Sequence, residues 1–503
     1  MKYLTRRSSS IIAVALIASF LFAIPTAFLD AASARGFVKG ASVADLKAAY
    51  AQAAAGGEKV RILIVPGHES DYGGAEYAGY YERELVVPLS ERLAAELRAD
   101  PRLEVLVARG TAGWNSDFER YFDSRMSSIE RFVERHKKEM KKLLRRGRIA
   151  ELEEQAGHNA ARTDVAFRLY GITKWSNEND VDLMIHVHLN DAGGRSDAEP
   201  GAYTGLSIYV PDRQYGNAEA SRAVAEEVFA RLNRYAATST LPIEDKGVVE
   251  DQELIALGAY NTAEIPSILI EYGYIYEPKN LHEETRDAIY ADQAYWTAEG
   301  VRAFFGASAT GRYDARILPY AWATDSTAVA TSTTSVGLYA LQVALRDQGF
   351  YPPAPSTLIN CPIDGVMRNC VTDALAAYQK AKDLAETGTL SLATRTALNA
   401  AYAPPSVVAS VPPASGAACA PFGATLALGS TDGAGSAVTR LQAMLAQDPN
   451  IYPEGSVTGY FGPLTDRAVK AFQVKHGIAS AGSQGYGLVG PLTTKALLAA
   501  CAV

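Results

Sequence analysis

Three short apolar runs in this chain each lead into a residue that can bind a metal ion or transfer a proton. The runs and the residues that follow them are Val60–Val65 before Gly67-His68, Val181–Ile185 before His186-Val187-His188, and Ser267–Ile270 before Glu271. Such runs predict strands buried on both faces of a mostly parallel sheet. Ligands of these sheets collect outside the carboxyl ends of the strands. We therefore expect an α/β fold with a metal-hydrolase site at that edge.

The length and charge of the chain limit its organisation and its partners. A chain of 503 residues is too long for one core and predicts about three folded units. Its net charge of −8 argues against a general nucleic-acid binder, whose domain would be basic. We therefore expect no nucleic-acid partner.

The N-terminus predicts export. Lys2, Arg6 and Arg7 precede an apolar stretch over 11–29, and Ala32-Ser33-Ala34 forms a small-x-small cleavage site. We interpret 1–34 as a cleaved signal peptide, and an uncleaved membrane anchor is the competing interpretation. With either, the rest of the chain lies outside the cytoplasm, in the cell envelope or secreted.

Apolar periodicity and linker composition divide the rest of the chain. Residues 35–58 are predicted to be a linker with one short helix, which begins after an N-cap at Ser42. Residues 59–306 alternate strand and helix patterns, which predicts an open, mostly parallel sheet flanked by helices. Linkers rich in small and polar residues follow over 307–333 and 403–418.

The segments 334–402 and 419–503 repeat one another. Leu341-Gln342 and Tyr378-Gln379 in the first correspond to Leu441-Gln442 and Phe472-Gln473 in the second. Helical spacing of the apolar residues predicts two small modules of three helices each. All four cysteines fall in this region, and we expect Cys361–Cys370 and Cys419–Cys501 pairs because each pair lies within one module.

This order of motifs resembles the peptidoglycan-binding module at the ends of bacterial cell-wall hydrolases. The second copy follows the family pattern from Gly459-Tyr460-Phe461-Gly462 to Phe472-Gln473. In the first copy, 366–370 replaces the aromatic–glycine turn, so its competence to bind the wall stays open. The resemblance implies peptidoglycan as the partner.

The first domain resembles the zinc-dependent N-acetylmuramoyl-L-alanine amidases. The motifs that carry the resemblance are, in order, Gly67-His68, Gly74-Ala75, a helix-start glutamate, a strand ending at Arg109, the stretch Asp182–Asn190 around His188, and Pro266–Tyr274 around Glu271. The resemblance implies a Zn²⁺ held by His68, Glu84 and His188. It also implies that Glu271 acts as general base and acid in cleaving the amide bond between N-acetylmuramic acid and L-alanine.

The chemistry of these residue types agrees with that assignment. Three protein ligands and one open position suit a catalytic zinc. Glu82 is the alternative to Glu84, which we prefer because of its register with Leu89 and Leu93. His186 points to the same side of its strand as His188. We expect it to be a hydrogen-bonding neighbour of the site, and an alternative ligand otherwise.

Two further features depart from the family pattern. Glu69 stands where a glycine is expected after the ligand histidine, and it could slow or gate the reaction. A helical insertion over about 114–163 carries the basic run 136–146. We interpret this run as a solvated face, and the alternatives are a contact with anionic wall polymer or membrane, or a lid over the cleft.

Two rival functions remain open from the sequence. The first is a zinc peptidase that cuts within the stem peptides. The second is a catalytically silent wall-binding protein, which would lack a ligand, although no candidate ligand is missing here.

Overall fold

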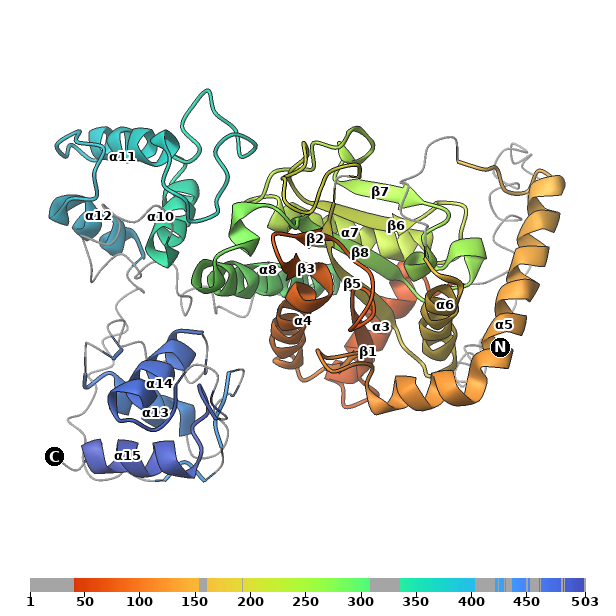
Figure 1. The fold of residues 1–503 in the computed structure, drawn as a ribbon, viewed down its shortest axis with the longest axis horizontal. Helices are drawn as coiled ribbons and strands as arrows, with labels where there is room; N and C mark the ends of the chain where they lie inside the picture. The colour runs from red at the N-terminus through yellow and green to blue at the C-terminus, as the bar shows by residue number, and fades with distance from the viewer. Residues whose placement is uncertain are drawn as a thin grey trace, which may run out of the picture.

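The computed structural model describes residues 40–152, 161–191, 193–307, 335–402, 421–423, 425–428, 430, 437–448, 451–452, 461, 463–480, 483 and 485–501. These residues form an α/β domain and two helical modules (Figure 1). The predicted signal peptide 1–34 and Cys419 lie outside the described residues. No helix among the described residues is long and apolar enough to cross a membrane.

A six-stranded sheet forms the centre of the α/β domain. Its strands are β1 (Val60–Pro66), β4 (Leu103–Val107), β5 (Leu183–Asn190), β6 (Ser207–Pro211), β7 (Val248–Asp251) and β8 (Ser267–Tyr274), in the order β4-β1-β5-β8-β6-β7. The pairs β4–β1, β1–β5 and β5–β8 are parallel, whereas β6 runs antiparallel to β8. The sheet is therefore mostly parallel, as predicted, although β6 and β7 were not expected from the sequence.

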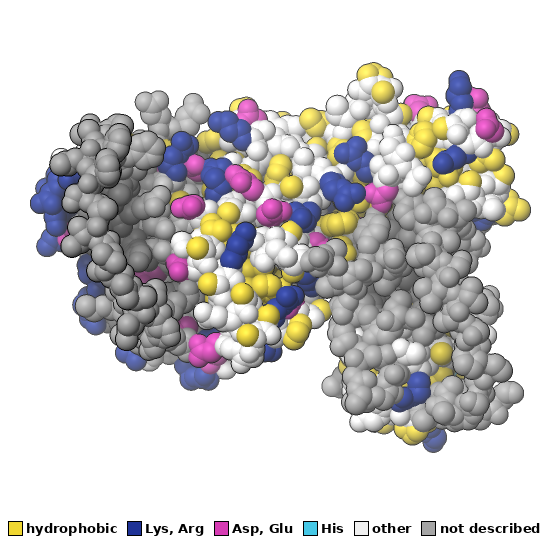
Figure 2. Space-filling view, turned by 180° about the vertical axis from the view of Figure 1, so that it is seen from behind, with side chains coloured by type: hydrophobic (Ala, Val, Ile, Leu, Met, Phe, Trp, Pro, Cys, Tyr) yellow, Lys and Arg dark blue, Asp and Glu magenta, His cyan; other side chains and the backbone are white. Residues whose placement is uncertain are grey.

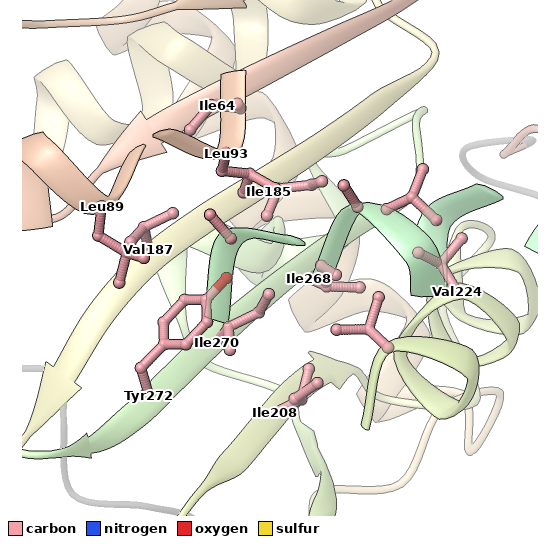
Figure 3. Close-up of a cluster of buried hydrophobic side chains, with 14 of the residues drawn as sticks. Ile64, Leu89, Leu93, Ile185, Val187, Ile208, Val224, Ile268, Ile270 and Tyr272 are labelled. Atoms are coloured by element: carbon pink, nitrogen blue, oxygen red, sulfur yellow. The ribbon is translucent and has the colours of Figure 1, made fainter. Parts of the chain in front are cut away.

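One face of the sheet is covered by α4 (Glu82–Arg98), α7 (Ala218–Leu232) and α8 (Glu283–Phe304). Figure 3 shows Leu89 and Leu93 of α4 and Val224 of α7 packed against isoleucines of the central strands. Burial of each such side chain contributes roughly 2 kcal/mol relative to exposure. The helix α3 (Val43–Ala54) also packs here through Leu46 and Tyr50. The predicted linker 35–58 therefore contains a helix that belongs to the domain.

The opposite face is covered by the insertion and the helix that follows it. The helix α5 (Ser116–Arg145) begins after Asn115, whose side chain accepts hydrogen bonds from the backbone of the first turn. The helix α6 (Thr163–Glu178) lies beside it, and together they bury Phe118, Phe122 and Trp175 against the sheet. The apolar face of the insertion is therefore part of the core.

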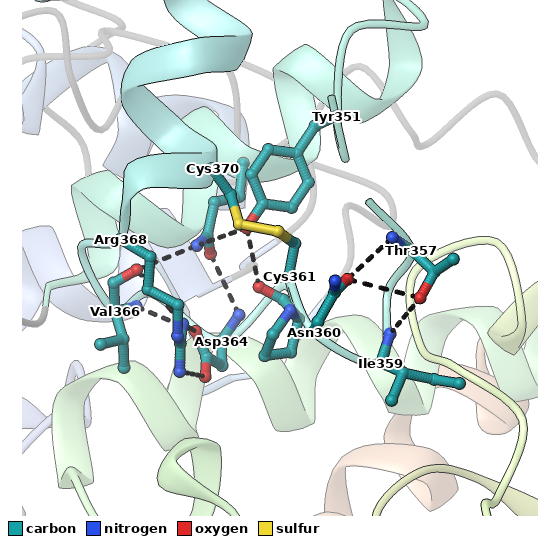
Figure 4. Close-up of a disulfide and its surroundings, with 11 residues drawn as sticks. Tyr351, Thr357, Ile359, Asn360, Cys361, Asp364, Val366, Arg368 and Cys370 are labelled. Carbon is teal, nitrogen blue, oxygen red and sulfur yellow. Dashed lines mark hydrogen bonds and ion pairs between the residues drawn. A yellow bond between two sulfur atoms is a disulfide. The ribbon is translucent and has the colours of Figure 1, made fainter. Parts of the chain in front are cut away.

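The described residues of each C-terminal module form three helices, as predicted. They are α10 (Val336–Asp347), α11 (Asn369–Ala381) and α12 (Leu392–Tyr402) in the first module, and α13 (Ala437–Leu445), α14 (Pro463–Lys475) and α15 (Pro491–Cys501) in the second. The Cys361–Cys370 disulfide is formed (Figure 4). Beside it, Arg368 donates to the Asp364 carboxylate over 2.7 Å. The Cys419–Cys501 pairing stays a prediction, because Cys419 lies outside the described residues.

The first module is docked on the α/β domain through α8. Ala288 and Ile289 of α8 share one buried apolar cluster with the module's own core. The buried Tyr339 hydroxyl donates to Asp292 over 2.8 Å, and the Tyr235 hydroxyl donates to Asp347 over 2.7 Å. This module is thus held against the α/β domain by packing and hydrogen bonds.

Candidate metal centre

The carboxyl ends of β1 and β5 and the first turn of α4 bring three metal-binding side chains together. The Nε2 atom of His68 lies 2.9 Å from one Glu82 oxygen, and the Nδ1 atom of His188 lies 3.0 Å from the other. One potential ligand atom from each residue lies within 4.8 Å of the others. The predicted convergence of His68 and His188 is therefore present.

The third member of the cluster is Glu82, which corrects the expectation of Glu84. The helix α4 begins at Glu82, two residues before the predicted start, so Glu82 occupies its first turn facing the histidines. Glu82 is 2 % exposed, whereas Glu84 is exposed to solvent. The register of Glu84 with the buried leucines was a poor guide, because residues of a helix's first turn are placed by the preceding loop as well as by the helix.

Two glycines give the cluster the space that it needs. A Cβ atom on Gly67 would lie 2.6 Å from Cε1 of His188, and one on Gly74 would lie 2.8 Å from Cδ2 of His68. Gly74 also has a φ of +89°, which favours glycine. His68 has a φ of +66°, which is unusual for a residue with a side chain and is a form of strain that collects at functional sites.

The backbone around these glycines is fixed by two charged side chains. The Glu82 carboxylate accepts from the amides of Ala75 at 2.8 Å and Leu189 at 3.0 Å. The buried Arg109 guanidinium donates to the carbonyls of Pro66, Gly67 and Arg83. Arg109 therefore ties the loop that carries His68 to the start of α4. This contact explains why an arginine follows strand β4.

The electrostatics of Glu82 suit a ligand that remains ionised. Burial alone raises the pKa of Glu82, but the interactions with His68 and His188 outweigh burial and hold the pKa well below its ordinary value. Two imidazoles and one ionised carboxylate are a donor set that catalytic zinc ions use. The arrangement of the donor atoms fits a divalent ion of this type, and so does the space that Gly67 and Gly74 leave for the two imidazoles.

Glu271 lies beside the cluster and outside it. It is paired in register with His188 across β5 and β8 and is 6 % exposed. Its Oε2 atom has no hydrogen-bond partner among the described residues. Burial, Glu82 and Glu244 all raise the pKa of Glu271 well above its ordinary value. Burying a carboxyl group without a hydrogen-bond partner lowers the stability of the fold, which favours a role for Glu271 in the chemistry of the site.

His186 and Glu69 have different surroundings from the three clustered residues. His186 is buried in β5 and lies outside the ligand cluster, and its Nε2 atom has no hydrogen-bond partner among the described residues. Burial and His188 lower the pKa of His186 to about 3, although a hydrogen bond with the Ala256 backbone opposes this. The Glu69 carboxylate is held by Arg168 at 2.8 Å and Trp114 at 2.7 Å. Glu69 therefore connects the loop that carries His68 to Trp114, where the insertion begins, and to Arg168 of α6, which follows the insertion.

A cavity of about 570 Å³ opens onto the cluster and is large enough for a ligand of several chemical groups. His68, Glu82, His188 and Glu271 line it, and so do Val165 and Leu169 of α6. Helix α6, which follows the insertion, thus forms one wall of the site. The mostly parallel sheet, the cavity at the ends of its strands and the His-Glu-His cluster together define an α/β domain with a hydrolase-type metal centre.

Comparison with known families agrees with this class. Residues 62–303 match the N-acetylmuramoyl-L-alanine amidase family, and residues 334–398 and 434–497 each match the peptidoglycan binding domain family. The chain therefore contains an N-acetylmuramoyl-L-alanine amidase domain, and two peptidoglycan-binding repeats follow it. These families support a hydrolase that acts on peptidoglycan at the cell wall.

Solved structures of amidases are also similar to the chain. An amidase from Clostridium difficile 630 is 17% identical, with a TM-score of 0.32, over 50% of this chain and 100% of its own. The amidase AmiC2 of Nostoc punctiforme is 18% identical, with a TM-score of 0.30, over 49% of this chain and 97% of its own. The amidase Ami1 from Mycobacterium smegmatis is 15% identical, with a TM-score of 0.32, over 50% of this chain and 98% of its own. No curated relative matches the chain.

Sequence reasoning missed one acidic residue near the site. Glu244 lies in the short helix η1 (Pro242–Glu244), is fully buried, and accepts hydrogen bonds from Asn190 at 2.8 Å and from the hydroxyls of Tyr209 and Tyr274. No motif surrounds it, and its partners come from three different strands. Only the fold brings its negative charge close to Glu271.

Proposed function

We propose that the domain over 59–306 hydrolyses the amide bond between the lactyl group of N-acetylmuramic acid and the L-alanine of the stem peptide. In this proposal, Zn²⁺ is held by His68, Glu82 and His188. The observation that carries it is the convergence of these three side chains beside the buried carboxyl of Glu271, whose Oε2 atom has no hydrogen-bond partner among the described residues. The match to the amidase family supports the choice of bond.

A bound zinc ion would supply Lewis acidity toward the amide carbonyl and toward a water molecule at its open position. The residues of the chain supply the rest. Glu82 stays ionised, and because it is the only carboxylate among the three proposed ligands, a divalent ion would keep a net positive charge for the developing oxyanion. Gly67 and Gly74 keep the space in which the ligands meet.

Glu271 moves the proton in this proposal. It accepts the proton that the attacking water loses, and it delivers that proton to the nitrogen of L-alanine as the C–N bond breaks. Its position next to His188 on the neighbouring strand supports this role, because the base must lie near the ligands without being one of them. The product is a free L-alanine amine and an intact lactyl carboxylate.

The remaining regions would bring the enzyme to its substrate. A tethered wall-binding module raises the effective concentration of the catalytic domain on an insoluble polymer. We propose that the second module does this, since its sequence follows the family pattern. We also propose that the chain is exported through its N-terminal segment, which is a signal peptide or an anchor.

The decisive experiment is mass spectrometry of purified peptidoglycan after digestion by the full chain, with zinc supplied and with a chelator. We expect release of stem peptides with a free L-alanine amine, loss of this product with chelator, and loss on the order of 10²–10⁴-fold in Glu271→Gln. Glu84→Gln is the matched control and should retain activity. Cleavage within the peptides would support the peptidase, and no product from any substrate would support the silent wall-binding protein.

A further inference from the structure

The C-terminal half of α5 carries a concentrated positive charge that the amidase chemistry does not use. Between Arg131 and Arg148, nine side chains are basic and only Glu134 and Glu139 are acidic. The whole chain has a net charge of −8. A local excess of this size attracts polyanions even when the protein as a whole is acidic.

A groove of about 770 Å³ runs between α5 and the C-terminal end of α6. Arg125, Arg131 and Arg135 line it from α5, and Lys174 lines it from α6. The aromatic rings of Tyr121 and Trp175 also contribute to its surface. It is separate from the amidase cavity, with which it shares no lining residue.

The lysine of the groove is held by its neighbours, whereas the three arginines have no ion-pair partner among the described residues. Lys174 is 9 % exposed, and its ammonium is held by Glu178 and by the Tyr121 hydroxyl at 3.1 Å. By contrast, the guanidinium groups of Arg125, Arg131 and Arg135 form no ion pair within the described chain, and all three residues are exposed. Glu178 and Glu264 are the acids among the described residues that line the groove.

The cations continue beyond the groove along the same helix. Arg131, Arg135, Lys138, Lys142 and Arg145 follow one another at alternating spacings of four and three residues. At about 100° per residue this spacing places them on one face of α5, over roughly 20 Å. Lys142 is paired with Glu139 at 3.1 Å, and the other four have no acidic partner within the described chain.

The absence of an exposed apolar face on α5 favours a polymer over a membrane as the binding partner. A helix that binds a membrane surface presents an exposed apolar face. The apolar residues of α5 face the core, and none of the large exposed hydrophobic residues lies on α5. Figure 2 shows Lys and Arg side chains along the edge of the catalytic domain farthest from the modules, which is the edge that α5 forms in Figure 1.

We propose that the α5–α6 groove and the basic face of α5 bind a linear polyanion whose repeating units carry phosphate or carboxylate groups. The guanidiniums bind the anionic groups, because their planar forks match both. The groove shares no lining residue with the amidase cavity, so a polyanion bound there would hold the enzyme in place without occupying the amidase site.

The test measures binding of the full chain to three labelled probes: short-chain polyphosphate, poly-L-glutamate, and vesicles that contain an anionic phospholipid. The variant Arg131→Glu/Arg135→Glu is compared with Lys59→Glu/Lys246→Glu, which makes the same change in charge at exposed positions elsewhere. Hydrolysis of a soluble peptidoglycan fragment serves as the readout of the amidase site.

We expect one or both polymers to bind, and binding to weaken steeply with salt. The α5 variant should bind on the order of tenfold more weakly or worse, and the control variant should bind like the parent. A stronger response to polyphosphate or to polyglutamate identifies the anionic group. Equal binding by both variants, no polymer binding at low salt, or binding to vesicles alone would overturn the proposal. Hydrolysis of the soluble fragment should not change, which separates this proposal from the amidase proposal.

Discussion

The backbone of Gly67 lies against the imidazole of His188, and a Cβ atom on Gly67 would stand 2.6 Å from its Cε1 atom and 2.7 Å from its Nδ1 atom. Nδ1 is the atom that faces Glu82. Gly67, the residue before His68, thus determines how close His188 can come to the loop that carries His68. The Gly-His pair after β1 is therefore a single geometric unit, in which the glycine is as necessary as the ligand.

Gly67→Ala should displace His188 and reduce the affinity for metal. A shift of about 1 Å in such a site costs on the order of 10²-fold in rate. Gly110→Ala is a suitable control, since a Cβ there would meet no atom within 4 Å. The measurement is metal content after dialysis together with hydrolysis rate. Unchanged metal content and rate in Gly67→Ala would show that the two histidines do not share an ion.

Glu82→Gln should lose metal affinity by more than about 100-fold, whereas Glu84→Gln should keep it. The reason is that only the buried Glu82 meets His68 and His188, and a neutral amide cannot replace the charge of the carboxylate. Competition with a fluorescent zinc chelator measures the affinity without any substrate. The reverse pattern, with loss in Glu84→Gln only, would return the assignment to Glu84.

Acid should destabilise the protein through the buried His136 of α5. Burial and the nearby Arg135 lower the pKa of His136 to about 4 in the folded protein. Below the ordinary histidine pKa of about 6.5, His136 binds a proton in the unfolded chain but stays neutral in the folded chain. The free energy of unfolding therefore falls as the pH falls from 6.5 toward 4. The loss from this one residue is about 3 kcal/mol at most.

His136→Gln removes this titration and should flatten the dependence of stability on pH. The comparison is urea unfolding of both proteins between pH 7.5 and pH 4.5 with chelator present. His186, whose pKa is lowered to about 3, keeps part of the slope. Parallel curves for the parent and the variant would mean that His136 is accessible to protons in the folded state.

The mostly parallel sheet and the position of the site could be predicted because both depend on patterns that are local in the sequence. A buried parallel strand needs a continuous apolar run, so β1, β5 and β8 are visible in the sequence together with the residues at their ends. Short mixed strands leave a weaker pattern. β6 and β7 contain Tyr209, Pro211 and Asp251, and their burial depends on neighbours that are distant in sequence.

The choice between Glu82 and Glu84 could not be made locally. It depends on where α4 begins, and that point is fixed by tertiary contacts. The amide of Glu82 donates to the Ala75 carbonyl, and the Ala75 amide donates to the Glu82 carboxylate. Glu244 was invisible for the same reason, since its partners Asn190, Tyr209 and Tyr274 meet only in the folded sheet.

The first module should unfold together with the catalytic domain, because the two share the apolar cluster on α8. Tyr339→Phe removes the hydroxyl that donates to the Asp292 carboxylate in this buried interface, and it should lower the free energy of unfolding by about 2 kcal/mol.

Tyr378→Phe is the matched control in the same module. The Tyr378 hydroxyl is buried without a hydrogen-bond partner among the described residues, so its loss should be neutral or slightly stabilising. Urea unfolding of the full chain, followed by tryptophan fluorescence, reports on the catalytic domain, because three of the chain's four tryptophans lie in that domain and none lies in a module. If Tyr339→Phe leaves that transition unchanged, the module is not coupled to the amidase domain in solution.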